Sequence, residues 1–385
     1  MSLENQRELG IAKLFFRLQQ VPQSPATVVA NESLATDDEN WNFTRTVKSL
    51  MGNETLNVQV HPGLQVNYPP WQMEPVNVCQ GVSALTDPSS GPTKQQLFLE
   101  HAELHIDSTS VYTDGSKSDG GVGSGVVVPS LSLSDSASLP KEASIFTAEL
   151  FAIILGLELI RHIPSRNYTF YTDSRSASQA LRQYAPKNAF VTKIKGLIHH
   201  MRTALQITIQ FCWTPSHIGI RGNELADTIA KAAIRLPMRN LMIPYSDLIA
   251  MAKLKLRQRW QSLWDTQVGN KLHCVKPKVN KWESSFHKRR KYEVTVARLR
   301  IGHCNFSHIH LMLNQPAPQC CGQDLSVSHA LVECPTTERI RLSLFPHWRN
   351  VQNTARLKEL LSEDGGFNIE KLMELLSRLN LSNKI

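Results

Sequence analysis

Hydrophobic and polar positions follow strand or helix spacing through the middle third of the chain. Alternating and β-branched runs predict five strands, and apolar residues at helical spacing predict helices between them. The strand runs span residues 108–117, 122–128, 131–139, 167–173 and 206–213, and the helical runs span 143–163, 174–183, 191–205 and 223–236. Three strands form a meander before strands and helices alternate. This order predicts an α/β unit over 106–236, a five-stranded mixed sheet flanked by helices.

The regions on either side of this unit are patterned differently. Residues 1–105 are poorly patterned, so we expect an irregular, partly disordered connector with a short helix near its end. Residues 237–300 predict a basic helical segment. Residues 301–385 predict a Cys/His knuckle-like region and a helical tail. The expected organisation is therefore a connector, the α/β unit and a basic, mainly α-helical C-terminal region.

Length and composition restrict the class of protein. A chain of 385 residues predicts two or three domains. No apolar run is long enough to cross a membrane, and the first residues lack the apolar core of a signal peptide. The seven cysteines are scattered and form no even framework, which is typical of a reducing compartment. We expect an intracellular protein, in the cytoplasm or nucleus and not secreted, whose oligomeric state the sequence leaves open.

Positive charge is concentrated in one segment. The net charge of the chain is +9, and residues 237–300 alone carry +11. Aromatic residues lie among these basic residues, including Trp260, Trp264, Trp282 and Tyr292. Basic and aromatic residues together suit phosphate contact and base stacking, so we expect a nucleic-acid partner. The alternatives are a solvated helical surface for the charges and a helical core for the aromatics.

Four acidic residues occupy positions where acid is locally unexpected. Asp114 lies in a strand, Glu149 in an apolar helix, Asp173 at a strand end and Asp227 among small residues of a helix. Asp114 could also begin a hairpin turn, since Gly115 follows it. Buried carboxylates are costly, and clustered ones raise one another's pKa unless cations neutralise them. Oxygen ligands of this kind suit Mg²⁺ or Mn²⁺, although periodicity does not show that the four converge.

Four motifs link these residues to a known family. YTDGSK, FTAELFAI, YTDSRSASQAL and WTPSHIGIRGNELADTIAKAA, in this order over 108–236, resemble those of a type 1 ribonuclease H domain. Within that family, the motifs resemble the domain that follows the polymerase in Jockey-like non-LTR retrotransposon proteins. The resemblance implies neighbouring strands for Asp114 and Asp173. It also implies that Asp114, Glu149, Asp173 and Asp227 form a metal-binding tetrad.

The resemblance further implies a reaction. The expected activity is endonucleolytic hydrolysis of the RNA strand of RNA–DNA hybrids with two Mg²⁺ or Mn²⁺ ions, giving 5′-phosphate and 3′-hydroxyl ends. His217 would assist proton transfer or product departure, although a loop histidine is otherwise expected to be a solvent-exposed residue. The candidate substrate contacts are Gly115, Ser116, Ser174 and Asn223, each of which a turn or helix cap would also explain.

An inactive nucleic-acid-binding remnant of a retrotransposon protein is the alternative. The chain shows no polymerase motif, and the resemblance implies a protein that begins after the polymerase. A transposase or integrase on a related fold suits the order of acidic residues less well. An inactive protein would still bind the hybrid or RNA through the basic segment, and this binding would weaken steeply with salt.

A Cys/His cluster near the C-terminus resembles the knuckle of the same elements. Its candidate Zn²⁺ ligands are Cys320, Cys321, His329 and Cys334. Zinc ligands are typically spaced C-x₂₋₄-C, and adjacent cysteines depart from that spacing. Cys304, His308 and His310 are alternative ligands. The cluster would otherwise be a set of reduced, partly buried cysteines.

Overall fold

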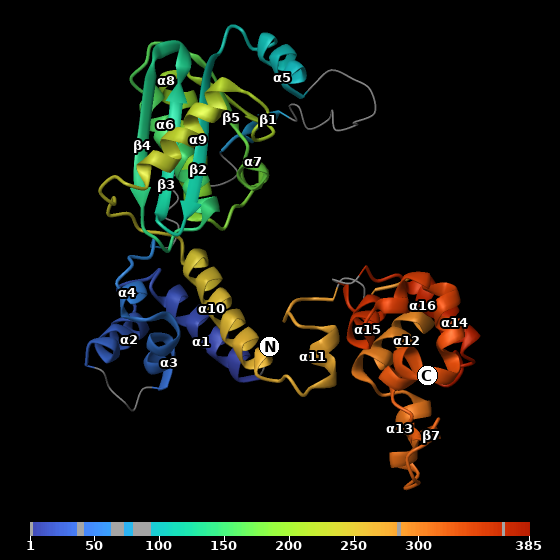
Figure 1. The fold of residues 1–385 in the computed structure, drawn as a ribbon. Helices are drawn as coiled ribbons and strands as arrows, with labels where there is room; N and C mark the ends of the chain where they lie inside the picture. Colours follow the sequence, from blue (N-terminus) through green and yellow to red (C-terminus); the bar gives the residue numbers. More distant parts are fainter. Residues whose placement is uncertain (1–2, 37–41, 63–72, 80–93, 283–285, 364–365) are drawn as a thin grey trace. The chain divides into compact units, whose positions relative to one another are not determined.

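The structure is a computed structural model that describes residues 3–36, 42–62, 73–79, 94–282, 286–363 and 366–385. The chain divides into two compact units, residues 1–256 and residues 257–385 (Figure 1). Within the described ranges, no helix combines the length and apolar character needed to span a membrane.

A six-stranded mixed sheet organises the first unit. Its strands are β1 (Asn77–Cys79), β2 (Thr109–Ser118), β3 (Gly121–Val128), β4 (Leu133–Leu139), β5 (Asn167–Thr172) and β6 (Thr208–Trp213). They lie in the order β1-β6-β5-β2-β3-β4. The strands β2, β3 and β4 form an antiparallel meander, whereas β5 runs parallel to β2, β6 to β5 and β1 to β6. The five predicted strands are confirmed, and β1 is an additional edge strand that the sequence did not predict.

Helices cover both faces of this sheet (Figure 1). They are α5 (Lys94–Glu103), α6 (Ile145–Ile160), α7 (Arg175–Arg182), α8 (Ala189–Leu205) and α9 (Arg221–Ala233), with a short η3 (Pro129–Leu131). The hydroxyl of Ser144 caps α6 by accepting from the Thr147 amide. Most of α6 is buried, because it packs between the sheet and α8. The predicted ribonuclease H-like α/β arrangement is therefore present.

Helices also form where the sequence suggested an irregular connector. Residues 3–56 contain α1 (Leu3–Leu18), α2 (Pro25–Thr36), α3 (Asn42–Met51) and α4 (Asn53–Leu56). Their apolar residues, including Phe15 and Met51, share a core with Leu248 of α10 (Tyr245–Asp265). Tertiary packing thus overrides the weak local pattern. The parts of the expected connector at 63–72 and 80–93 lie outside the described residues.

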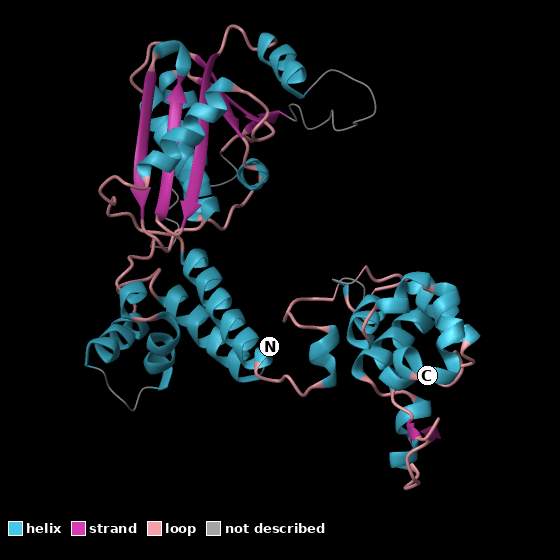
Figure 2. Ribbon diagram, in the orientation of Figure 1, coloured by secondary structure: helices cyan, strands magenta, loops and turns pink. Residues whose placement is uncertain are grey.

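The second unit is almost entirely helical (Figure 2). After the end of α10 it contains α11 (Lys271–Val275), α12 (Arg290–Ile301), α13 (Asn305–Met312), α14 (Glu338–Leu344), α15 (Asn353–Leu361) and α16 (Ile369–Arg378). Shorter elements are β7 (Gln319–Cys320), β8 (Gln323–Asp324), η5 (His329–Glu333), η6 (Pro335–Thr337) and η7 (Pro346–Asn350). Trp348 is fully buried in its core.

Two of the scattered cysteines are paired, which the sequence did not predict. Cys79 and Cys212 form a disulfide. They are neighbours in register on the parallel strands β1 and β6, although 133 residues separate them in sequence. Sequence spacing could not show this pair, because it depends on the additional strand β1.

Candidate active site

The sheet places two of the predicted carboxylates on adjacent strands. Thr113 of β2 is the register partner of Thr172 at the end of β5, and Asp114 and Asp173 follow these two residues directly. Asp114 is 5% exposed, and Asp173 is partly buried. The two carboxylates therefore meet where the parallel pairing of β2 with β5 ends, on neighbouring strands as the ribonuclease H resemblance implied.

Glu149 reaches the same point from α6, and Gly115 makes that approach possible. A Cβ added to Gly115 would lie 2.5 Å from the Glu149 amide nitrogen and 2.8 Å from the Ala148 carbonyl carbon. Only a glycine lets the helix backbone come this close to β2. The Ser124 hydroxyl on β3 also donates to the Ala148 carbonyl at 2.7 Å. The first turns of α6, and with them Glu149, are thus fixed against β2 and β3.

Asp227 approaches from α9, on the opposite face of the sheet from α6. Glycines on β3 again provide the space, since a Cβ on Gly125 would lie 2.6 Å from the Ala230 amide nitrogen. A Cβ on Gly222 would in turn clash with the Tyr112 ring of β2. Asp227 accepts from the Lys231 ammonium at 2.7 Å, one helical turn later. This packing brings its charge close enough to affect both Asp114 and Asp173.

Burial and mutual repulsion make the ionised form of this cluster costly. The pKa of Asp114 is raised to about 8, chiefly by burial and then by the charges of Asp173 and Asp227. Burial also raises the pKa of Glu149 well above its usual range, and Asp114 and Asp173 add to the effect. The pKa of Asp173 is raised by burial, against which Asn223 and His217 act. Such shifts are typical of functional sites.

The cluster has the composition of a divalent-cation site. Carboxylate oxygens of Asp114, Glu149 and Asp173 all lie within 4.8 Å of one another. One oxygen of Glu149, Oε2, is buried without a hydrogen-bond partner among the described residues. A cation bound by these oxygens would neutralise the repulsion and satisfy that atom, and oxygen donors of this kind suit Mg²⁺ or Mn²⁺. Asp227 lies outside this group of three.

Two other predicted residues lie beside Asp173. The Asn223 side chain is buried, and its Nδ2 donates to Asp173 Oδ2 at 3.4 Å, while its Oδ1 is buried and has no partner within the described part of the chain. Asn223 thus orients a candidate ligand. His217 is exposed in the loop after β6, with a left-handed backbone at φ 54°. It is close enough for its charge to lower the pKa of Asp173.

Two of the remaining predicted substrate contacts have structural roles, and the third shows none. Ser174 caps α7, where its hydroxyl accepts from the Ala177 amide at 3.3 Å. Gly115 provides the space for α6 described above. Ser116 is half-buried on β2. Contact of these residues with a substrate stays a prediction.

Three residues at the site were missed by sequence reasoning. The indole of Trp213 donates to the Asp173 carbonyl at 2.8 Å, and the Arg175 guanidinium lies over its ring at 4.2 Å. Lys231 neutralises part of the cluster through Asp227. The spacing of Asp227 and Lys231, four residues apart on a helix, was a readable signal for an ion pair. The pairing of Trp213 with Arg175 joins a strand to a helix and left no such signal.

The predicted C-terminal Cys/His cluster also converges. Ligand atoms of Cys320, Cys321, His329 and Cys334 all lie within 4.8 Å of one another. The Cys334 sulfur lies 3.6 Å from that of Cys320 and 3.8 Å from that of Cys321. Tetrahedral zinc with Zn–S bonds of about 2.3 Å sets its sulfurs about 3.8 Å apart. The four residues therefore have the spacing of a zinc site.

The backbone explains how two adjacent cysteines reach one point. Cys320 ends β7, and Cys321 and Gly322 form the turn to β8 with φ values of 47° and 78°. These left-handed conformations direct consecutive side chains to the same side of the hairpin, which extended backbone would not do. The Cys321 sulfur lies 3.1 Å from His329 Nε2. The pKa of Cys334 is lowered to about 6 by hydrogen bonds from Thr336 and the other two thiols, although burial opposes this shift.

The alternative zinc ligands lie elsewhere. Cys304, His308 and His310 are outside the group whose ligand atoms converge. Cys304 is buried at the start of α13, and burial raises the pKa of its thiol to about 12. His308 Nδ1 lies 2.9 Å from the Ser307 hydroxyl. Of these candidates, the group that converges is the one whose cysteines are adjacent.

Residues 107–235 match the family model of RNase H. The match covers about a third of the chain and includes every residue of the carboxylate cluster, together with His217 and Asn223. No curated protein matches the chain. The match supports a type 1 ribonuclease H domain over these residues, and with it a nuclease role and nucleic-acid binding.

Proposed function

We propose that the chain hydrolyses the RNA strand of RNA–DNA hybrids, leaving 5′-phosphate and 3′-hydroxyl ends. The observation that carries this proposal is the buried cluster of Asp114, Glu149 and Asp173 inside the region that matches RNase H. When bound, two divalent cations would activate a water and stabilise the departing oxygen. Asp114, Glu149, Asp173 and Asp227 would hold them. Selectivity for RNA would come from the 2′-hydroxyl and the shape of the hybrid.

The protein's own groups have separate roles in this proposal. Asn223 orients the Asp173 carboxylate through its amide nitrogen. The exposed imidazole of His217 is free to exchange a proton with solvent and with a phosphate or product oxygen near Asp173. Lys231 offsets the charge of Asp227. The indole of Trp213 fixes the backbone at Asp173.

The test is cleavage of a labelled RNA–DNA hybrid with Mg²⁺, with Mn²⁺ and with EDTA. We expect metal-dependent cutting of the RNA strand and its loss in Asp173→Asn. The matched control is Asp119→Asn, which makes the same chemical change in the exposed turn after β2. No cutting with either metal, or equal cutting by Asp173→Asn and the control, would reject the nuclease proposal.

The remnant alternative predicts a different outcome in the same samples. Hybrid or RNA binding would persist, weaken steeply with salt and show no turnover at any metal concentration. Residues 237–300 would supply the binding charge. Two predictions from the sequence stay predictions. They are the derivation of the chain from a Jockey-like retrotransposon protein and its intracellular location.

We also propose that Cys320, Cys321, His329 and Cys334 bind one Zn²⁺, on the basis of their mutual distances. Metal analysis of the full chain should show loss of one zinc equivalent in Cys334→Ser. The matched control is Cys274→Ser, since Cys274 is also a free cysteine of the second unit. Equal zinc content in the two variants would contradict the assignment.

A further inference from the structure

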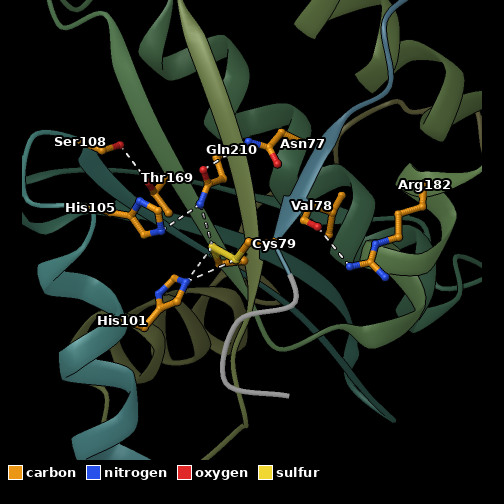
Figure 3. Close-up of a disulfide and its surroundings, with 10 residues drawn as sticks. Asn77, Val78, Cys79, His101, His105, Ser108, Thr169, Arg182 and Gln210 are labelled. Atoms are coloured by element: carbon orange, nitrogen blue, oxygen red, sulfur yellow. Dashed lines mark hydrogen bonds between the residues drawn. A yellow bond between two sulfur atoms is a disulfide. The ribbon is translucent and has the colours of Figure 1, made fainter. Parts of the chain in front are cut away.

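A second sulfur–imidazole cluster lies at the edge of the sheet, far in sequence from the C-terminal one. Cys79 of β1 and Cys212 of β6 face each other in register and are joined as a disulfide (Figure 3). His101, in the last turn of α5, points its ring at the two sulfurs (Figure 3). Three elements thus bring two cysteines and a histidine to one point.

The imidazole is placed as a metal-bound imidazole would be. His101 Nε2 lies 3.4 Å from the Cys79 sulfur and 3.6 Å from the Cys212 sulfur. In a tetrahedral zinc site, Zn–S and Zn–N bonds of about 2.3 and 2.1 Å set the sulfur and nitrogen about 3.6 Å apart. The three ligand atoms lie within 4.8 Å of one another. Disulfide sulfur is only a weak hydrogen-bond acceptor, so the disulfide gives this imidazole little stabilisation.

The surroundings of the cluster are partly buried and polar. His101 is half-buried, and the ring centroid of His105 lies 4.8 Å from its own. The other nitrogen, Nδ1, is buried without a hydrogen-bond partner among the described residues. The Gln210 amide lies 3.5 Å from the Cys212 sulfur and would donate to a thiolate there.

We propose that Cys79, His101 and Cys212 form a zinc site when the disulfide is reduced, with a water as fourth ligand. A dithiol reductant supplies two electrons and two protons. The sulfur–sulfur bond breaks, two thiols form, and the dithiol becomes its own disulfide. Zn²⁺ then displaces the two thiol protons and binds both thiolates and His101 Nε2. Disulfide and zinc are alternative links among the same elements, so β1 stays joined to β6 in either redox state.

The consequence concerns the edge of the nuclease domain. β6 leads directly into the loop that carries His217. The helix α5 packs on the sheet through Phe98, which contacts Tyr171 of β5. With the thiols reduced and no metal present, neither a covalent bond nor a metal joins the three-residue strand β1 to β6. Bound zinc would therefore hold β1 and α5 on the sheet in a reducing compartment, where the disulfide would not persist.

Cobalt titration of the full chain tests the site. The C-terminal Cys/His cluster is removed first by Cys321→Ser and Cys334→Ser, and the protein is reduced with a phosphine under anaerobic conditions. We expect one equivalent of Co²⁺ to produce a thiolate-to-cobalt charge-transfer band. His101→Ala and Cys212→Ser should weaken binding at least tenfold. The matched controls are His162→Ala, on an exposed residue outside the cluster, and Cys274→Ser. Equal affinity in His101→Ala and His162→Ala would overturn the proposal.

A second measurement uses the unsubstituted protein, so it does not depend on whether a variant folds. Reduced protein with all its cysteines is treated with iodoacetamide with and without Zn²⁺, and the modified cysteines are mapped by mass spectrometry. We expect zinc to slow modification of Cys79 and Cys212 at least tenfold while Cys274 reacts equally in both samples. Oxidised protein should show neither protection nor a cobalt band from this site. Equal modification of Cys79 and Cys212 with and without zinc would reject the site.

Discussion

Replacing Gly115 with alanine tests how the carboxylate cluster is assembled. The new Cβ would lie 2.5 Å from the Glu149 amide nitrogen, 2.8 Å from the Ala148 carbonyl carbon and 3.0 Å from the Ala148 Cβ. Ordinary contacts begin at 3.4 Å, so α6 would have to move by roughly 0.9 Å. That movement is opposed because almost all of α6 is buried against the sheet and α8.

The expected penalty follows from overpacking. Forcing a methyl group into a packed interior costs about 1–3 kcal/mol. For a unit of this size each kcal/mol lowers the melting temperature by about 2–4 °C, so Gly115→Ala should lower it by about 2–12 °C. Glu149 moves with α6, and a misplacement of about 1 Å can reduce catalysis on the order of 10²-fold. Any hybrid cleavage should therefore fall by about that factor.

A matched substitution gives the opposite sign. Gly196 lies within α8, and a Cβ built there meets nothing within 4 Å. Gly196→Ala should stabilise the protein by about 0.8–1.0 kcal/mol, because alanine is the better helix former. Thermal and urea unfolding of both variants measure the difference. If Gly115→Ala unfolds like wild type, α6 is not held against β2 as tightly as the structure implies.

Three further predictions concern the charges around this cluster. The folded pKa of Asp114, about 8, lies above its ordinary 3.8, so its contribution to the stability of metal-free protein should be greatest below pH 4 and be lost as pH rises toward 8; Asp114→Asn should flatten that loss in melts with EDTA, and an unchanged slope would refute the assignment. Lys231→Met removes the cation paired with Asp227, so Mg²⁺ should bind more tightly by calorimetry, whereas weaker binding would give Lys231 another role. Asn223→Ala removes a hydrogen bond that lowers the pKa of Asp173, so the rising limb of the pH–rate profile should move to higher pH; a shift to lower pH would contradict this role.

The sequence predicts most of the nuclease fold because its signals are local. The alternating strand at Asp114 and the apolar helix at Glu149 both lie where predicted, and the register of Thr113 with Thr172 agrees with the expected neighbours. The approach of Asp227 toward the other acids was implied only by the resemblance. In the structure it depends on close approaches of α9 at Gly125 and of α6 at Gly115, which periodicity does not encode.

The features that the sequence did not predict depend on contacts between distant residues. Strand β1 has only three residues and is defined by its pairing with β6. The N-terminal helices share a core with Leu248 of α10, about two hundred positions along the chain. The convergence of Cys320 and Cys321 requires a left-handed backbone at Cys321, which residue spacing alone did not indicate. In each case the missing information is tertiary.

The carboxylate cluster itself distinguishes a nuclease from a binding remnant. A pKa raised from 3.8 to about 8 means that Asp114 lowers the stability of the metal-free fold at neutral pH by on the order of 4 kcal/mol. A chain that only bound nucleic acid would fold better with a neutral amide there, and would meet phosphate with less repulsion. In a remnant, Asp114→Asn should therefore improve both stability and hybrid affinity, with no dependence on Mg²⁺. In a nuclease the same variant should be more stable without metal, yet lose Mg²⁺-dependent hybrid binding along with cleavage. The stability change has the same sign in both cases, so it does not distinguish the two functions. The metal dependence of hybrid binding does.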